Sequence, residues 1–206
     1  MNRFLRLAAV AALALGLAGR AAPAAGLPSK PGPDPARYAG EYGRMREPSW
    51  RGGFPNLRRF EVLAPSTGRD GKAKAYNCIA HTLRVYDRWV WPGGRMADFD
   101  RLYGEHGYRR VRGLDYRFRP DLEKVVLYAR TLPGGGSECT HGSRQLADGT
   151  WTSKLGAGPL IRHASPESVS GPSYGRPIAV YVRPRKAPLA PAKTNRANTL
   201  VASAAP

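Results

Sequence analysis

SECTHGSRQLADGTWTSKL, at residues 137–155, is the segment of this chain that says most about its fold. Asp148-Gly149 favours a two-residue β-hairpin turn, and β-prone runs flank it on both sides. We predict a strand over residues 137–146 and an antiparallel partner strand over residues 150–155.

The turn also predicts which side chains share a face of this hairpin. A two-residue turn pairs Ala147 with Thr150 and places His141 opposite Gly156. Because side chains alternate along a strand, one face then holds Cys139, His141, Ser143, Gln145, Thr152 and Lys154. Ser153 faces away in this register, and a one-residue bulge or a longer turn would exchange the faces.

Other segments add two helices and more strands. Helical spacing of apolar residues predicts helices over residues 77–86 and 95–105. Residues 59–63, 124–130 and 178–183 have the composition of strands. The order predicts an α+β domain whose N-terminal helices pack against an antiparallel sheet of about four to five strands.

The N-terminus resembles a secretory signal peptide over residues 1–25. Arg3 and Arg6 precede an apolar run from Leu7 to Gly19, and Ala22 to Ala24 offers a cleavage site. The run is too short to cross a bilayer, which takes about 20 residues. We expect a secreted or periplasmic protein with no transmembrane span after signal removal.

The rest of the chain divides by composition. Residues 26–57 are rich in Pro, Gly and Arg and are predicted to be an extended arm or linker. Its aromatic residues predict that part of it packs on the domain. Residues 58–185 form the predicted folded domain, and residues 186–206 the predicted disordered tail.

The chain is strongly basic, with a formal net charge of +18 from 33 Lys and Arg against 15 Asp and Glu. Such a protein is expected to adhere to anionic surfaces. The basic residues are spread along the chain and form no helix-length stripe, so no dedicated nucleic-acid module is expected.

Cys78 and His141 are the candidate catalytic residues. A cysteine at a helix start lies at the positive end of the helix dipole, which favours the thiolate. A histidine from a strand is the usual partner that takes the thiol proton. The backbone N–H of Cys78, with the side chain of Asn77, is the predicted oxyanion donor.

A third residue to orient the imidazole is harder to find. The partner strand offers Thr152, Ser153 and Lys154. A hydroxyl can accept the imidazole N–H, whereas a lysine ammonium cannot. Thr152 and Ser153 are therefore the candidate supporting residues.

Two non-catalytic readings of the cysteines stay open. In an exported protein Cys78 and Cys139 are candidates for a disulfide, which would close a loop of about 60 residues. Alternatively Cys78, His81, Cys139 and His141 form a candidate tetrahedral zinc set. Apart from that alternative, no cofactor or metal is expected.

Four motifs carry a resemblance to known proteins: YNCIAH at 76–81, WVWP at 89–92, THGSRQL at 140–146 and WTSKLG at 151–156. Together they resemble a bacterial domain family of unknown function, over roughly residues 58–183. More remotely, the Cys-then-His order resembles papain-like and NlpC-type thiol hydrolases, which cleave peptide bonds or cell-wall peptides. That likeness implies a papain-like fold, with Cys78 as nucleophile and His141 as base.

These observations lead to two functional hypotheses. The first is an exported papain-like domain that hydrolyses amides or peptides of the cell envelope with Cys78 and His141. The second is a non-catalytic, disulfide-stapled basic module that binds anionic envelope polymers or an acidic partner.

Overall fold

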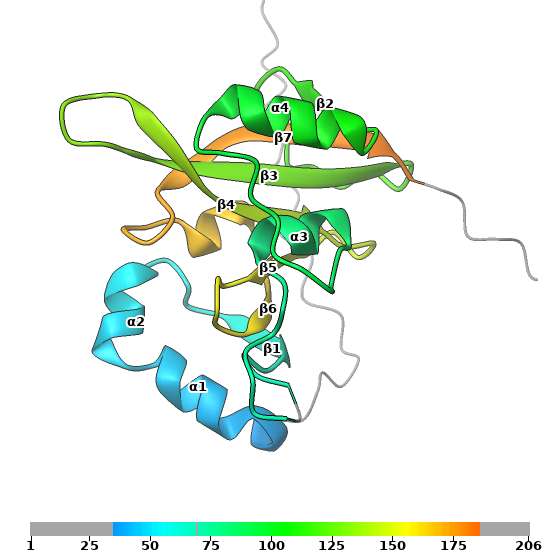
Figure 1. The fold of residues 1–206 in the computed structure, drawn as a ribbon. Coiled ribbons are helices and arrows are strands. Elements are labelled where there is room, and N and C mark those ends of the chain that lie inside the picture. Colours follow the sequence, from blue (N-terminus) through cyan, green and yellow to red (C-terminus); the bar gives the residue numbers. More distant parts are fainter. Residues whose placement is uncertain (1–34, 69, 186–206) are drawn as a thin grey trace, which may run out of the picture.

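The computed structural model describes residues 35–68 and 70–185, which form an α+β domain around one antiparallel sheet (Figure 1). The sheet has seven strands in the order β1-β6-β5-β4-β3-β7-β2. Their bounds are β1 Phe60–Ala64, β2 Arg109–Val111, β3 Leu122–Thr131, β4 Ser137–Gln145, β5 Trp151–Lys154, β6 Leu160–His163 and β7 Arg176–Pro184. The predicted α+β class is confirmed, and the sheet is larger than the four to five strands expected.

Helices cover both faces of this sheet. The helical elements are η1 Pro35–Tyr38, α1 Ala39–Met45, α2 Pro48–Gly53, α3 Cys78–Leu83, α4 Met96–Glu105 and η2 Pro166–Val169. Val125 and Leu127 of β3 belong to one buried apolar cluster with α3 and α4. The alternate residues Val126 and Tyr128 belong to a second cluster with α1 and the end of α2. Burial on both faces explains why β3 is apolar without alternation.

Residues 35–53 form η1, α1 and α2 with a two-residue turn before α2, where an extended arm or linker is predicted. Met45 and Phe54 are buried in the core, as the aromatic content of this segment suggested. Glu41 accepts hydrogen bonds from the backbone N–H and hydroxyl of Ser66, at 2.7 and 2.6 Å. Burial and these bonds hold the helices against the sheet. The predicted signal peptide and tail lie outside the described residues.

The predicted register of the β4–β5 hairpin is wrong by one residue. Gln145 pairs with Trp151 and Arg144 with Thr152, and the backbone N–H of Leu146 donates to the carbonyl of Thr150 at 2.7 Å. The connection is thus one residue longer than a two-residue turn. Since the side-chain period is two, Thr152 and Lys154 move to the face opposite His141, and Ser153 joins the His141 face.

A bulge in β4 separates Cys139 from His141. Tyr128 pairs with His141 and the next residue, Ala129, pairs with Cys139, so Thr140 is the extra residue. Cys139 therefore belongs to the α3 and α4 cluster, while His141 lies beside Tyr128 on the other face. The predicted shared face of Cys139 and His141 is wrong for this reason.

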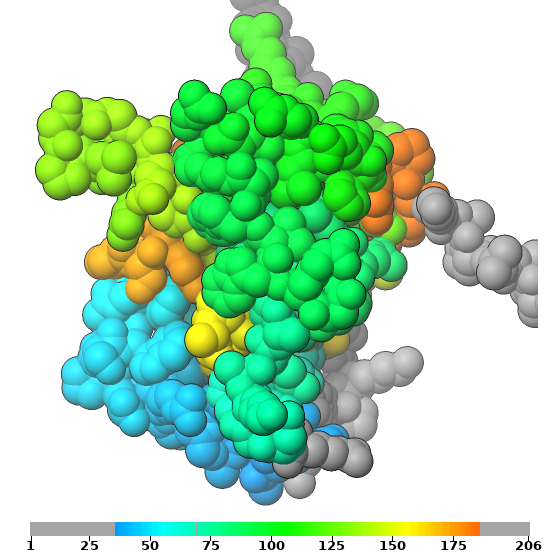
Figure 2. All heavy atoms as spheres, viewed as in Figure 1, coloured from blue at the N-terminus to red at the C-terminus, as the bar shows by residue number. Residues whose placement is uncertain are grey.

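The β3–β4 hairpin extends beyond the rest of the molecule (yellow-green in Figure 2). β5 pairs only with residues 144 and 145 of β4, so the first part of β4 has no strand on that side. This early separation of β4 from β5 makes room for the site described next.

Candidate functional site

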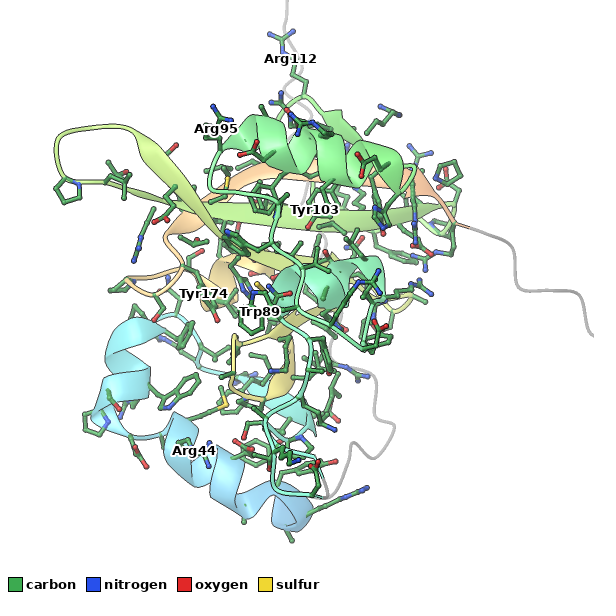
Figure 3. The ribbon with its side chains drawn as sticks, viewed as in Figure 1. Arg44, Trp89, Arg95, Tyr103, Arg112 and Tyr174 are labelled. Atoms are coloured by element: carbon green, nitrogen blue, oxygen red, sulfur yellow. The ribbon has the colours of Figure 1, made fainter. Side chains whose placement is uncertain are left out.

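A pocket of about 360 Å³ lies where β5 no longer pairs with β4. Its lining comes from the start of α3, the loop before α4, β4, and the loops after β5 and η2: Asn77, Cys78, Trp89, Trp91, Thr140, Gly156 and Tyr174. Figure 3 labels two of its walls, Trp89 and Tyr174, near the middle of the molecule. The predicted nucleophile therefore lies in a pocket.

Asn77 fixes the start of α3 and the aromatic loop together. Its side-chain oxygen accepts from the backbone N–H of Ala80 at 2.9 Å, the bond of a helix N-cap. The same side chain donates to the carbonyl of Val90 at 2.8 Å. These bonds use the oxygen and one of the two N–H groups of the amide, so the other N–H of Asn77 remains for the predicted oxyanion role.

Cys78 is a buried thiol. Burial raises the pKa of Cys78 to about 11. Two influences act in the opposite direction and are weaker: the charge of Lys154 and the backbone N–H groups of Gly142, Ile79 and Cys78. The helix start therefore does not give a thiolate at neutral pH in this state, contrary to the expectation from the helix dipole.

His141 is fully buried and has no hydrogen-bond partner at either ring nitrogen. Its ring stacks on Tyr174, with 3.9 Å between the ring centroids and 4° between the planes. Burial, with the nearby imidazoles of His163 and His81, holds its pKa well below the usual range. Cys78 and His141, the predicted nucleophile and base, therefore share no hydrogen bond in this structure.

The direction of the β4 side chains explains this separation. A Cβ built on Gly142 would lie 3.0–3.1 Å from side-chain atoms of Ile79 and Thr82, so Gly142 faces α3. His141 precedes Gly142 and faces the opposite side of the sheet, toward Tyr128. Cys78, which the backbone N–H of Gly142 contacts, thus lies beside the residue that follows His141, while the imidazole stacks on Tyr174, another residue of the pocket lining.

The two predicted supporting residues, Thr152 and Ser153, contact histidines other than His141. Thr152 Oγ1 is 2.8 Å from Nε2 of His81, and Ser153 Oγ is 2.9 Å from Nε2 of His163. Neither contacts His141. The hairpin register puts Thr152 on the α3 face, and the second partner strand, β6, supplies His163 on the other.

Neither alternative reading of the cysteines is realised. Cys78 and Cys139 are free, buried thiols, so the candidate disulfide is not formed. Within residues 35–68 and 70–185 no three His, Cys, Asp or Glu side chains converge as metal ligands. The zinc set fails because His141 lies on the face opposite His81, which is bonded to Thr152.

Lys154 is the residue that the sequence analysis did not recognise as part of the site. Its side chain is fully buried and donates to the carbonyls of Gly156 and Gly158, at 2.5 and 2.7 Å. Burial lowers its pKa to about 8. The signal that could have found it is a lysine inside an otherwise β-prone run, in the motif WTSKLG.

Comparison with protein-family models gives one match, over residues 68–182, to a family described as Domain of unknown function (DUF7689). The chain belongs to this family. The resemblance to a domain family of unknown function is confirmed, and no curated protein and no solved structure matches the chain. The DUF7689 region contains every residue that lines the pocket.

The DUF7689 region does not include α1, α2 or β1, although Met45 and Phe54 complete its core. The DUF7689 match thus covers the site and most of the sheet, while the N-terminal helices belong to the same folded unit. No helix in residues 35–68 and 70–185 has the length and apolar character needed to cross a membrane.

Proposed function

We propose that this domain binds an uncharged, flat-faced group, an aromatic or apolar side chain of a cell-envelope peptide, in the pocket beside Cys78. The observation that carries the proposal is the lining, of which three residues are aromatic and none is charged. The chain has 33 lysines and arginines, so a neutral pocket stands out from its basic composition. Apolar walls with aromatic rings favour ligands of the same character.

The two tryptophans of the lining support this proposal. Trp89 is 57% exposed and Trp91 is 41% exposed, which is unusual for such large apolar side chains. A ligand that covers them removes apolar area from water, which is worth about 25 cal/mol for each Å². The neighbouring Asn77 anchors their loop, so the platform is held in place before a ligand arrives.

The polar groups of the lining are partly occupied. Asn77 caps α3, and the hydroxyl of Thr140 donates to the carbonyl of Tyr174 at 2.6 Å. The polar side-chain groups left to meet a ligand are the Cys78 thiol, the Tyr174 hydroxyl, the indole N–H groups of Trp89 and Trp91 and one amide N–H of Asn77. The pocket is therefore suited to apolar contacts with few hydrogen bonds.

Calorimetric titration with N-acetyl tripeptide amides tests the proposal, with Phe, Leu, Asp or Lys as the central residue. The Phe and Leu peptides should bind, and Trp89→Ala or Trp91→Ala should weaken binding about tenfold. Tyr86→Ala is the matched control, because Tyr86 is 50% exposed and lies outside the pocket lining. Binding of the Asp and Lys peptides as tight as that of the Phe and Leu peptides would overturn the proposal.

A second candidate function is amide hydrolysis by an exported, papain-like enzyme with Cys78 as nucleophile. It is favoured by the position of Cys78 in the pocket wall, with the N–H groups of Ile79 and Gly142 close to its sulfur. The sulfur would attack the carbonyl carbon of a bound peptide while these N–H groups donate to the oxyanion. The C–N bond would then break, with the thiol proton passing to the leaving amine, and water would hydrolyse the thioester to release the acid and restore the thiol. Export is inferred from residues 1–25.

Turnover of a Phe-containing peptidyl aminomethylcoumarin separates the two functions. Hydrolysis by the wild type that is lost in Cys78→Ser, with peptide binding retained, would support the enzyme. Binding without turnover in the wild type would exclude hydrolysis of this substrate class and leave the binding function standing.

A further inference from the structure

We propose that Lys154, and not His141, is the charged partner that controls ionisation of the Cys78 thiol. This inference rests on the thiol function proposed above. It assigns a role to a buried charge that the sequence motifs did not identify as functional.

The fold places Lys154 on the same side of the sheet as Cys78. Thr152, two residues earlier in β5, contacts His81 of α3, so this face of β5 packs on α3. The Lys154 ammonium then bonds the carbonyl of Gly156, which lines the pocket together with Cys78. The lysine therefore lies behind the pocket wall, beside the helix that carries the thiol.

The hydrogen bonds of Lys154 leave one of its N–H groups available. An ammonium has three N–H groups, and two of them are used by the carbonyls of Gly156 and Gly158. Within the described residues no carboxylate forms an ion pair with Lys154, and its Nζ lies 5.5 Å from the centroid of the Tyr76 ring. A thiolate at Cys78 would supply the missing negative charge for a buried cation.

Several titratable groups face Lys154. Cys78 and His81 come from α3, Glu41 from α1, and Lys74 and Tyr76 from the loop between β1 and α3. Burial lowers the pKa of Lys154 to about 8, Cys78 and Glu41 act to raise it, and Lys74 acts to lower it. In return, the charge of Lys154 lowers the pKa of Cys78.

His141 lacks the position for this role. Its imidazole lies beside Tyr128 and stacks on Tyr174, and neither ring nitrogen has a hydrogen-bond partner. Lys154 therefore assists thiolate formation below about pH 8, while its amine is charged. Above that pH the assistance disappears, because the neutral amine no longer stabilises the thiolate.

The experiment is the rate of Cys78 alkylation by iodoacetamide from pH 6 to 10, with the labelled residue mapped by mass spectrometry. Lys154→Met should react about tenfold more slowly than wild type at pH 7, which corresponds to one pKa unit. The ratio of the two rates should approach one above pH 9. His141→Gln is the matched control and should follow the wild-type profile.

Equal rates for Lys154→Met and wild type at pH 7, or a ratio that stays constant with pH, would overturn the proposal, because a purely structural role predicts no pH signature. Slowing in His141→Gln would overturn it too. If Lys154→Met does not fold, Lys154→Gln replaces it. The wild-type profile alone must also change slope near pH 8. Iodoacetamide needs no pocket ligand, so failure here is separate from failure of the peptide-binding or turnover assays.

Discussion

At the scale of single residues, Asn77 connects two parts of the site. It caps α3 through Ala80 and holds the tryptophan loop through Val90. Asn77→Ala should lower the free energy of unfolding by about 1–3 kcal/mol, because it removes the cap and leaves buried backbone groups without partners. Urea denaturation measures the change.

Asn77→Ser provides an internal comparison for this prediction. A serine keeps a side-chain oxygen that can cap α3 and lacks the N–H that bonds Val90, so its loss of stability should be smaller. Asn56→Ala is the surface control, because Asn56 donates an exposed hydrogen bond to Ser170. A loss for Asn56→Ala as large as for Asn77→Ala would contradict the argument.

Tyr174 determines the environment of His141. Its ring covers the imidazole, and both ring nitrogens of His141 lack partners. Tyr174→Ala should admit water to the imidazole and raise its pKa toward the ordinary value near 6.5, because desolvation is the main cause of the present shift. Proton NMR of the histidine ring measures this titration.

Tyr174→Phe is the matched control for this experiment, since it keeps the stacked ring and removes only the hydroxyl. The His141 pKa should stay low in that variant. An equal rise in both variants would show that the hydroxyl, and not the ring, excludes water. No rise in Tyr174→Ala would show that other groups keep His141 dry.

At the scale of elements, much of the secondary structure follows from the sequence. The predicted helices over residues 77–86 and 95–105 correspond to α3 and α4, and the runs at 124–130 and 178–183 lie within β3 and β7. Apolar periodicity was enough for the two helices, and β-prone composition was enough for the two strands. The short β2 and the four-residue β6 carry too little pattern to be predicted.

The register of the β4–β5 hairpin could not be predicted from the sequence, for a local reason. The Asp148 side chain accepts from both the N–H and the hydroxyl of Thr150, at 2.9 and 2.6 Å, and these bonds favour a longer connection than the Asp-Gly dipeptide suggested. The bulge at Thr140 has no sequence mark of its own. Cys78 could be placed in the site, whereas the direction of His141 depended on these two single-residue shifts.

Glu123 connects three elements by its charge. It is buried in β3 and pairs with Arg84 after α3 and Arg183 of β7, at 2.7 and 2.8 Å. Glu123→Gln should destabilise the protein by about 1–3 kcal/mol, because it keeps the shape and weakens the charged hydrogen bonds to two arginines that solvent partly reaches. Glu138→Gln, which removes the exposed pair with Arg130, should have little effect in the same urea titration.

An equal effect of these two substitutions would contradict a special role for the buried pair. Arg84 has a left-handed backbone with φ of 63°, and its bond to Glu123 accompanies that strained end of α3. The Glu123 cluster thereby fixes the end of α3 opposite Cys78. The stability of the site depends on both ends of this short helix.

At the scale of the whole molecule, a sheet covered on both faces encloses three neutral histidines. Burial lowers the pKa of His81 to about 3 and that of His163 to about 4, and it holds that of His141 well below the usual range. Each is free to ionise near pH 6.5 when the chain unfolds. The unfolded chain therefore binds protons at pH 5 that the folded protein excludes.

The sign of the effect follows from this difference in bound protons. The stability contribution is fully present above about pH 6.5 and is lost as the pH falls from there toward 4, through the pKa of His163 and on toward that of His81. Urea titrations between pH 7.5 and 4.5 should show a steady fall in the free energy of unfolding. Histidines on both sheet faces contribute, so the loss belongs to the fold as a whole.

His163→Gln tests this account quantitatively, because it removes one of the three buried imidazoles. Its glutamine can still donate to the carbonyl of Ser165, which His163 contacts at 2.8 Å through Nδ1. Near pH 5 the free energy of unfolding of this variant should fall less steeply with decreasing pH than that of the wild type. The two slopes should differ by about 1.4 kcal/mol for each pH unit, the value for one proton bound on unfolding. Identical slopes in the two proteins would mean that His163 is already protonated in the folded state, and that the sheet does not exclude its charge.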